Sequence, residues 1–150
     1  MGELITKLKR PVVENPESDR RDWVNLLDDL VHHFETWIGK DWATDKIKKP
    51  MRDSVLGAYE APGLLMQLNY TRVILEPIAR YAPGTDGVVD LARMPAYDLI
   101  ASLYRIKDEW RLHYAFQDEK AEAGARSAVS LPLNELNLRR VLDEFTGHVV

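Results

Sequence analysis

The 150-residue chain has 20 Lys and Arg against 24 Asp and Glu, a formal net charge of −4, and 45% hydrophobic residues. The acidic total argues against a dedicated nucleic-acid-binding domain, since such domains are usually basic. The absence of cysteine excludes disulfides, thiolate nucleophiles and Cys-ligated metal centres. Met1–Arg10 lacks a signal-peptide pattern, and no apolar segment approaches the ~18–20 residues that span a bilayer. We expect a cytoplasmic protein without a membrane segment.

The N-terminal part reads as an arm followed by a long amphipathic helix. Two prolines interrupt residues 1–17, which we expect to precede a single domain of residues 18–150. Ser18 or Asp19 is expected to cap the helix, and Gly39 to end it. The apolar stripe of this helix follows a period of 3.6 residues: Trp23, Leu26, Leu27, Leu30, Phe34, Trp37 and Ile38.

The middle of the chain is typical of antiparallel strands. Residues 40–62 give a weaker pattern, in which Ala61-Pro62-Gly63 is expected to be a break. Apolar residues then alternate from Leu64 to Tyr70, and a turn or bulge is expected near Thr71. A short strand is expected over residues 88–92, after a turn rich in Gly and Pro.

Residues 98–116 predict a hairpin. A three-residue loop would place Tyr104 opposite Leu112 and collect the large apolar groups on one face, and we prefer this register because burial fixes register. The 117–130 segment is small and charged and is expected to be an exposed connection. A last helix is expected from about Leu133 to Phe145.

These elements predict an α+β fold: an N-terminal helix, an antiparallel meander of about five strands, and a C-terminal helix packed on the same sheet face. The other sheet face is expected to be polar, with apolar members such as Leu103 and Ala101. The predicted core consists of Trp23, Leu30, Phe34, Trp37, Leu112, Tyr114, Leu138, Leu142 and Phe145.

The hairpin supplies the candidate ligand or partner surface: Tyr104, Arg105, Trp110, Arg111 and His113. If its polar side lines a cleft, the arginines and the imidazole are suited to binding an anion or polarising a carbonyl. The ordinary polar side of a half-buried sheet explains the same pattern more simply. No catalytic residue is assigned.

Other polar groups predict no cofactor or metal. His32 and His33 are adjacent and point about 100° apart on a helix, so a solvated helix face explains them better than a metal site. Glu76 and Asp90 are acids in apolar strands, each expected on the outer face of its strand. The cations of residues 46–52 are expected to form a solvated loop, with weak nucleic-acid binding as a minority hypothesis.

The leading functional hypothesis is a small non-catalytic interaction or regulatory protein that self-associates. A homodimer is expected because the outer sheet face contains Leu65 and Leu103, because the arm is apolar, and because no edge protection is visible. The alternative is a ligand-binding or enzymatic curved-sheet domain with a cavity around groups such as Tyr104 and His113. An enclosed polar cavity would favour the alternative, and a filled core with an exposed apolar patch would favour interaction.

Overall fold

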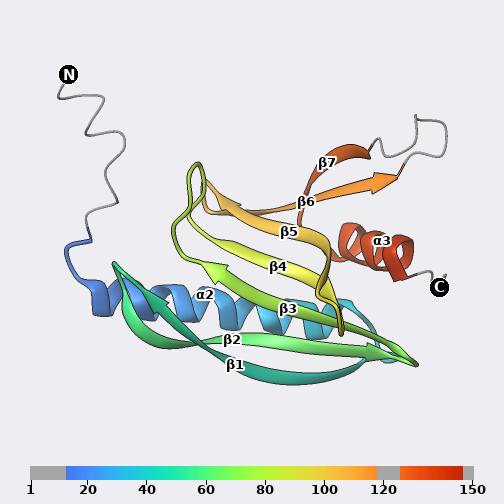
Figure 1. Ribbon diagram of the computed structural model, residues 1–150, viewed down its shortest axis with the longest axis horizontal. Coiled ribbons are helices and arrows are strands. Elements are labelled where there is room, and N and C mark those ends of the chain that lie inside the picture. Colours follow the sequence, from blue (N-terminus) through green and yellow to red (C-terminus); the bar gives the residue numbers. More distant parts are fainter. Residues whose placement is uncertain (1–12, 118–125, 147–150) are drawn as a thin grey trace.

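In the part of the chain that the structure describes, a seven-stranded antiparallel sheet and two helices form the fold (Figure 1). The computed structural model describes residues 13–117 and 126–146. The elements in chain order are α2 (Pro16–Trp37), β1 (Ala43–Asp53), β2 (Gly57–Leu68), β3 (Thr71–Ala79), β4 (Val88–Arg93), β5 (Asp98–Ile106), β6 (Glu109–Gln117), β7 (Arg126–Pro132) and α3 (Glu135–Thr146).

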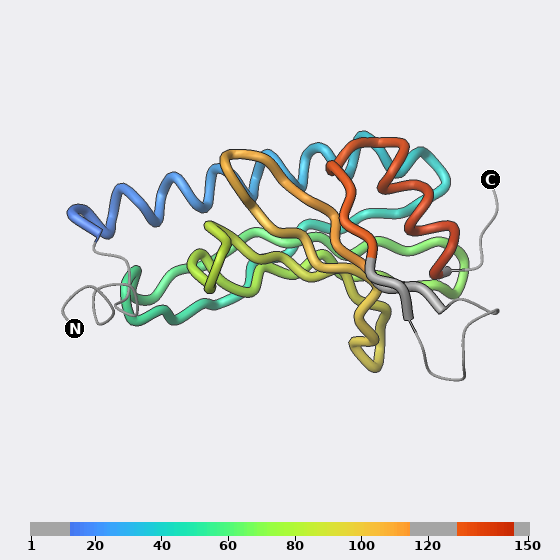
Figure 2. Tube along the Cα trace, turned by 90° about the horizontal axis from the view of Figure 1, so that it is seen from above, coloured from blue at the N-terminus to red at the C-terminus, as the bar shows by residue number. Residues whose placement is uncertain are grey.

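The strands form a meander in which each strand pairs with the next one along the chain, from β1 to β7. Both helices lie on one face of the sheet (Figure 2). The predicted α+β class and element order are therefore confirmed, with seven strands instead of about five. No described element covers the second face, which we call the open face. Neither described helix has the length and apolar composition needed to cross a membrane.

Helix α2 begins three or four residues earlier than the sequence pattern predicts. Asn15 is the N-cap, and its side chain accepts a hydrogen bond from the Ser18 amide at 3.1 Å. Pro16 occupies the first turn, where its missing N–H costs nothing. Gly39 follows the C-cap with a φ of +88°, a conformation that favours glycine. The predicted end of the helix is thus confirmed.

The predicted core is largely confirmed. Seven of its nine members are buried, while Trp37 and Phe145 are partly buried and pack against the same cluster. The largest fully buried side chains include Trp23 and Phe34 of α2, which belong to one hydrophobic cluster with leucines of the sheet. Aromatic and aliphatic side chains from both layers therefore fill the helix-covered side of the sheet.

The β5–β6 hairpin differs from the predicted register by one residue. The structure pairs Leu103 with Leu112, and Tyr104 with Arg111. The turn contains only Lys107 and Asp108, with φ values of +51° and +64°. Two successive positive φ angles are the geometry of the tight hairpin turn whose twist matches the strands, and this turn is adopted here without a glycine.

That shift reverses which β5 residues face the helices, since side chains alternate along a strand, whereas Leu112 and Tyr114 of β6 lie on the buried face as predicted. Leu103 is 0% exposed and Ala101 is 1% exposed, and both belong to the core. The prediction that they lie on the outer face is wrong. Conversely, Tyr70 does not continue the buried face of β2, because it lies in the β2–β3 turn and is fully exposed.

The expected break at Ala61-Pro62-Gly63 is also wrong, because these residues lie inside β2. Pro62 pairs with Lys48 of β1, and the pairing of β2 with β3 covers only Leu64–Leu68 on the β2 side. The first half of β2 therefore has a paired neighbour on one side only, and a proline without an N–H is tolerated there.

Strand β1 is one edge of the sheet and contains the basic segment, residues 46–52, which the sequence pattern places in a loop. Charged residues and a proline along an edge discourage pairing with another chain. The expectation of an unprotected edge is therefore wrong for β1. Residues 126–130 of the segment expected to be an exposed connection belong to β7 at the opposite edge of the sheet, while residues 118–125 and most of the predicted arm lie outside the described residues.

Candidate functional site

The five predicted site residues are divided between the two sides of the sheet. Tyr104, Arg111 and His113 lie on the open face, and the Tyr104 and His113 rings meet edge to face at 5.7 Å. Arg105 and Trp110 lie on the helix-covered side, where the Arg105 guanidinium is 5.5 Å from the Trp110 ring centroid. The hairpin does not bring all five to one place.

A row of polar side chains crosses the middle of the open face. Glu76 pairs with Asp90, Asp90 with Ser102, and Ser102 with His113 on successive strands. The Ser102 hydroxyl donates to Asp90 at 2.9 Å, and Lys49 forms a 2.8 Å ion pair with Glu76. The row joins the two acids that the sequence analysis considered separately, and Lys49 neutralises one of them.

Asp90 is the member of this row whose negative charge is least favourable in the folded protein. Its partial burial raises the pKa of the carboxyl above its ordinary value, and the facing Glu76 adds to that rise. The Ser102 hydrogen bond and the Lys49 charge act in the opposite direction. Two carboxylates placed opposite each other on neighbouring strands repel, so the row costs stability near neutral pH.

A second cluster joins the N-terminal half of α2 to the sheet. The Tyr81 hydroxyl donates to Asp19 at 2.5 Å, and Arg80 lies 3.5 Å from the same carboxylate. Arg80 also donates to the Asp86 carbonyl and stands 5.5 Å from the Trp23 ring centroid. Two segments far apart in the sequence, the first turns of α2 and residues 80–86, therefore meet around one arginine.

Burial and the Asp19 hydrogen bond raise the pKa of Tyr81 to about 12, so its hydroxyl stays a donor at neutral pH. Burial also raises the pKa of Tyr59, whereas the nearby Trp23 indole lowers it. The indole N–H lies close enough to the Tyr59 oxygen to lower this pKa as a hydrogen-bond donor, although the angle or distance is poor. Tyr59 therefore remains a neutral phenol next to the Trp23 indole.

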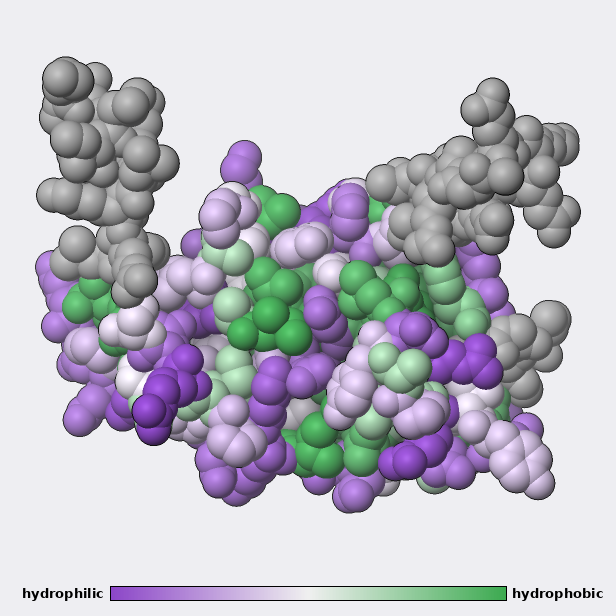
Figure 3. Space-filling model, viewed as in Figure 1, coloured by the Kyte–Doolittle hydropathy of each residue, from purple (hydrophilic) through white to green (hydrophobic). Residues whose placement is uncertain are grey.

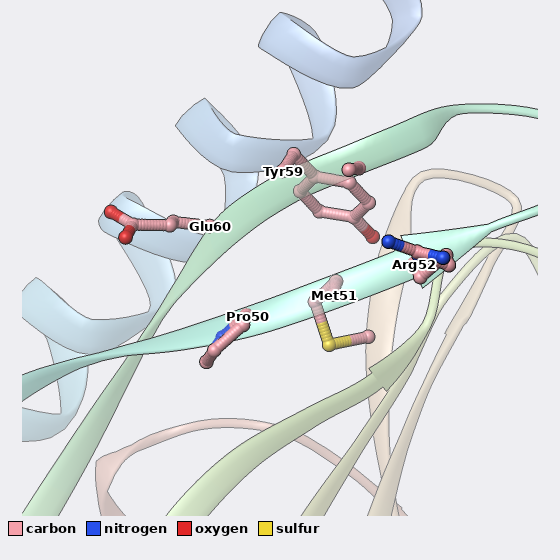
Figure 4. A pocket seen from close by; sticks show the side chains of 6 residues that line it. Pro50, Met51, Arg52, Tyr59 and Glu60 are labelled. Atoms are coloured by element: carbon pink, nitrogen blue, oxygen red, sulfur yellow. The ribbon is translucent and has the colours of Figure 1, made fainter.

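The described surface has open depressions. One, of about 420 Å³, lies on the β1–β2 hairpin (Figure 4) and is lined by Pro50, Met51, Arg52, Ala58, Tyr59 and Glu60. Another lies over α3 beside Arg139 and Glu144. Neither lies at Tyr104 and His113, where a cone-like ligand site is the alternative hypothesis. The core beneath that face is filled by Leu103 and its neighbours.

A tip between β4 and β5 projects from the sheet on the side away from the helices (Figure 2). Tyr97 is 54% exposed and Leu99 is 58% exposed, and the exposed charges of Arg93 and Asp98 lie near them in the chain. We call these four residues the tip patch. Tyr70 lies at the same end of the sheet, because β3 starts there beside the end of β4.

The basic segment is partly neutralised within the chain. Lys46 lies 3.6 Å from Glu35, and Lys49 pairs with Glu76. Two of its four cations therefore already have carboxylate partners, which leaves little charge for phosphates. His32 and His33 are exposed on α2, and among the described residues no three metal-ligating side chains converge.

Comparisons of the chain with protein-family models, curated proteins and solved structures found no match. Sequence reasoning missed Tyr59, Arg80 and Tyr81, which carry no motif and converge only through the fold. The one sequence feature that points to this cluster is the predicted turn at residues 83–87, which returns the chain toward α2. This turn predicts the cluster only once the position of α2 on the sheet is known.

Proposed function

We propose that the chain is a non-catalytic interaction protein that self-associates through the tip patch. The observation that carries the proposal is the exposure of Tyr97 and Leu99 on a projecting turn. Tyrosine and arginine are enriched among the residues that dominate binding energy at protein interfaces. The core under the helices is filled by side chains, which favours an interaction protein over a domain that encloses a ligand.

The charges of the tip patch are self-complementary. Arg93 and Asp98 are register partners at the base of the tip, and both are exposed. Around a two-fold axis, Arg93 of one copy faces Asp98 of the other, and the reciprocal pair forms by symmetry. Figure 3 shows that apolar side chains on the open face occur in separate clusters among polar ones, so charge pairing is needed beside apolar contact.

Light scattering at increasing micromolar concentration tests the proposal. We expect a mass that rises above the monomer value of 17.2 kDa, and a return toward that value for Leu99→Asp. The matched control is Leu136→Asp on α3, since Leu136 is 77% exposed and lies outside the tip patch. A mass of 17.2 kDa at every concentration, or equal losses in both variants, refutes self-association through the tip.

Exchanging the charges of Arg93 and Asp98 distinguishes an ion pair between two copies of the chain from a general effect of surface charge. Arg93→Asp alone and Asp98→Arg alone should each weaken association, because each places like charges opposite one another across the two-fold axis. The double variant restores opposite charges and should recover most of the association. Failure of the double variant to recover, with its melting temperature unchanged, argues against the proposed pairing.

A further inference from the structure

The β2 and β3 strands separate at a pair of prolines. Their last register pair is Leu64 with Leu75, and two residues further along the same register places Pro62 opposite Pro77. Neither proline has an N–H group, so the two strands can form no ladder hydrogen bond at this position. The sequence therefore ends the pairing of β2 with β3, while the pairing of β2 with β1 continues to Gly57.

The Pro77 carbonyl points toward β2 and takes its hydrogen bond from a side chain. The Met94 amide donates to the Arg72 carbonyl at 2.8 Å, so even-numbered residues of β3 bond toward β4 and odd-numbered ones face β2. Lys49 Nζ donates to the Pro77 carbonyl at 3.0 Å and pairs with the Glu76 carboxylate at 2.8 Å. A side chain of β1 thus reaches across β2 and supplies a donor where strand pairing supplies none.

The outer half of the β1–β2 hairpin is therefore joined to the rest of the domain through side chains. We call residues 48–62 the outer hairpin, and its turn stands apart from β3 and close to the start of α2 (Figure 1). Arg20 of α2 donates to the Leu56 carbonyl in that turn at 2.7 Å. Leu56 and Ala61 are buried, so the outer hairpin contains core residues that no backbone ladder to β3 secures.

Gly63 is the point at which this half of the hairpin can bend. A Cβ added to Gly63 would lie 2.7 Å from the Leu75 carbonyl oxygen, so the two backbones approach closely there. Glycine tolerates a wide range of backbone angles. Because the ladder between β2 and β3 covers Leu64–Leu68, a bend at Gly63 leaves that pairing intact.

We propose that the outer hairpin opens away from β3 as a unit about Gly63, and that the Lys49 ammonium is the latch that holds it closed. The β1–β2 ladder runs through the whole outer hairpin, so its two strands move together. Opening uncovers Leu56 and Ala61. Since the latch joins partly exposed charges, ionic strength controls the exposure of this apolar surface. The tip patch lies at the opposite end of the sheet, so the failure of one proposal leaves the other standing.

Single-cysteine labelling tests the opening, because the chain contains no cysteine of its own. Ala61→Cys reports on the outer hairpin, and Met66→Cys reports on the half of β2 that pairs with β3. Ala61 is 0% exposed and Met66 is 1% exposed, so both thiols react only after an opening. Local opening labels the first position alone, whereas global unfolding labels both, and we expect uncharged iodoacetamide to label Ala61→Cys at least about tenfold faster than Met66→Cys.

Removing the latch should accelerate only the outer reporter. Lys49→Met has a similar length and makes neither contact, so the labelling rate of Ala61→Cys should rise about 5–10-fold while that of Met66→Cys changes little. Glu76→Gln leaves the Pro77 carbonyl contact in place and should give a smaller rise. Lys48→Met is the matched control and should leave the rate unchanged, because Lys48 is the exposed neighbour of Lys49 on β1.

Salt provides a second readout of the latch. Raising sodium chloride from about 0.05 to about 0.5 M should accelerate labelling of Ala61→Cys about 2–3-fold with Lys49 present and leave the rate unchanged in Lys49→Met. Leu56→Cys, in the hairpin turn, provides the same measurement if Ala61→Cys does not fold. Equal acceleration of the inner and outer reporters by Lys49→Met means that the ion pair stabilises the whole domain, and no acceleration means that α2 holds the hairpin. Either result overturns the proposal.

Discussion

Truncating the two leucines of β5 tests the register of the sheet. Leu103 is 0% exposed and belongs to the core, whereas Leu99 lies four residues earlier on the same strand and is 58% exposed. Leu→Ala removes three carbons, so the lost burial at Leu103 is about 2.4 kcal/mol at ~0.8 kcal/mol per group. The cavity left among rigid neighbours raises the expected loss of unfolding free energy to about 3–4 kcal/mol.

Chemical denaturation and thermal melts measure this difference. For a domain of this size, Leu103→Ala should lower the melting temperature by about 6–15 °C, and Leu99→Ala should change stability by less than about 0.5 kcal/mol. Both variants lose the same atoms on the same strand, so their difference reports burial. Equal small losses would match the register expected from sequence, in which both leucines face outward, and would refute the register described above.

Two further predictions concern other parts of the sheet. Gly87→Ala places a Cβ 2.7 Å from the Trp23 ring and should lower the free energy of unfolding by about 1–3 kcal/mol through crowding. In the control variant Gly84→Ala the new Cβ meets nothing within 4 Å, but the φ of +78° is unfavourable for alanine, so its loss of stability reports backbone strain alone. In melts of the double variants, Trp23→Phe should relieve the Gly87→Ala defect and leave the Gly84→Ala defect unchanged. The pKa of Asp90 is raised in the folded state, so ionisation of this carboxyl destabilises the fold as pH rises above the ordinary pKa of 3.8. Asp90→Asn retains an acceptor for Ser102 and should therefore increase the free energy of unfolding by about 0.2–1 kcal/mol near neutral pH, and leave it unchanged well below the ordinary pKa of 3.8. A lower melting temperature of the variant near neutral pH would contradict this prediction.

The sequence predicts the elements whose patterns are long and local. The stripe from Trp23 to Ile38 predicts α2, and the turn at residues 83–87 predicts the start of β4, because each depends on neighbours in the chain. The sequence pattern predicts a break at Pro62, but a proline is acceptable where a strand has one paired neighbour, and that pairing is set by tertiary structure.

The remaining differences arise from contacts that no local pattern encodes. The side of the sheet on which Leu103 lies depends on a one-residue choice of turn, and Lys107 and Asp108 adopt left-handed conformations that a sequence rule assigns to glycine. The cluster of Tyr59 and Arg80 forms only because α2 crosses the sheet at that end. Residues of this kind become a site through packing, so sequence spacing alone does not find them.

The strictly sequential order of the strands has a consequence for synthesis on the ribosome. Each new strand pairs with the one that left the exit tunnel before it, so the sheet grows by local additions without a long-range closure. Helix α2 emerges ahead of every strand and packs mainly against β2. Its apolar stripe therefore lacks its main cover until β2 has emerged, and apolar surface exposed during this interval favours aggregation.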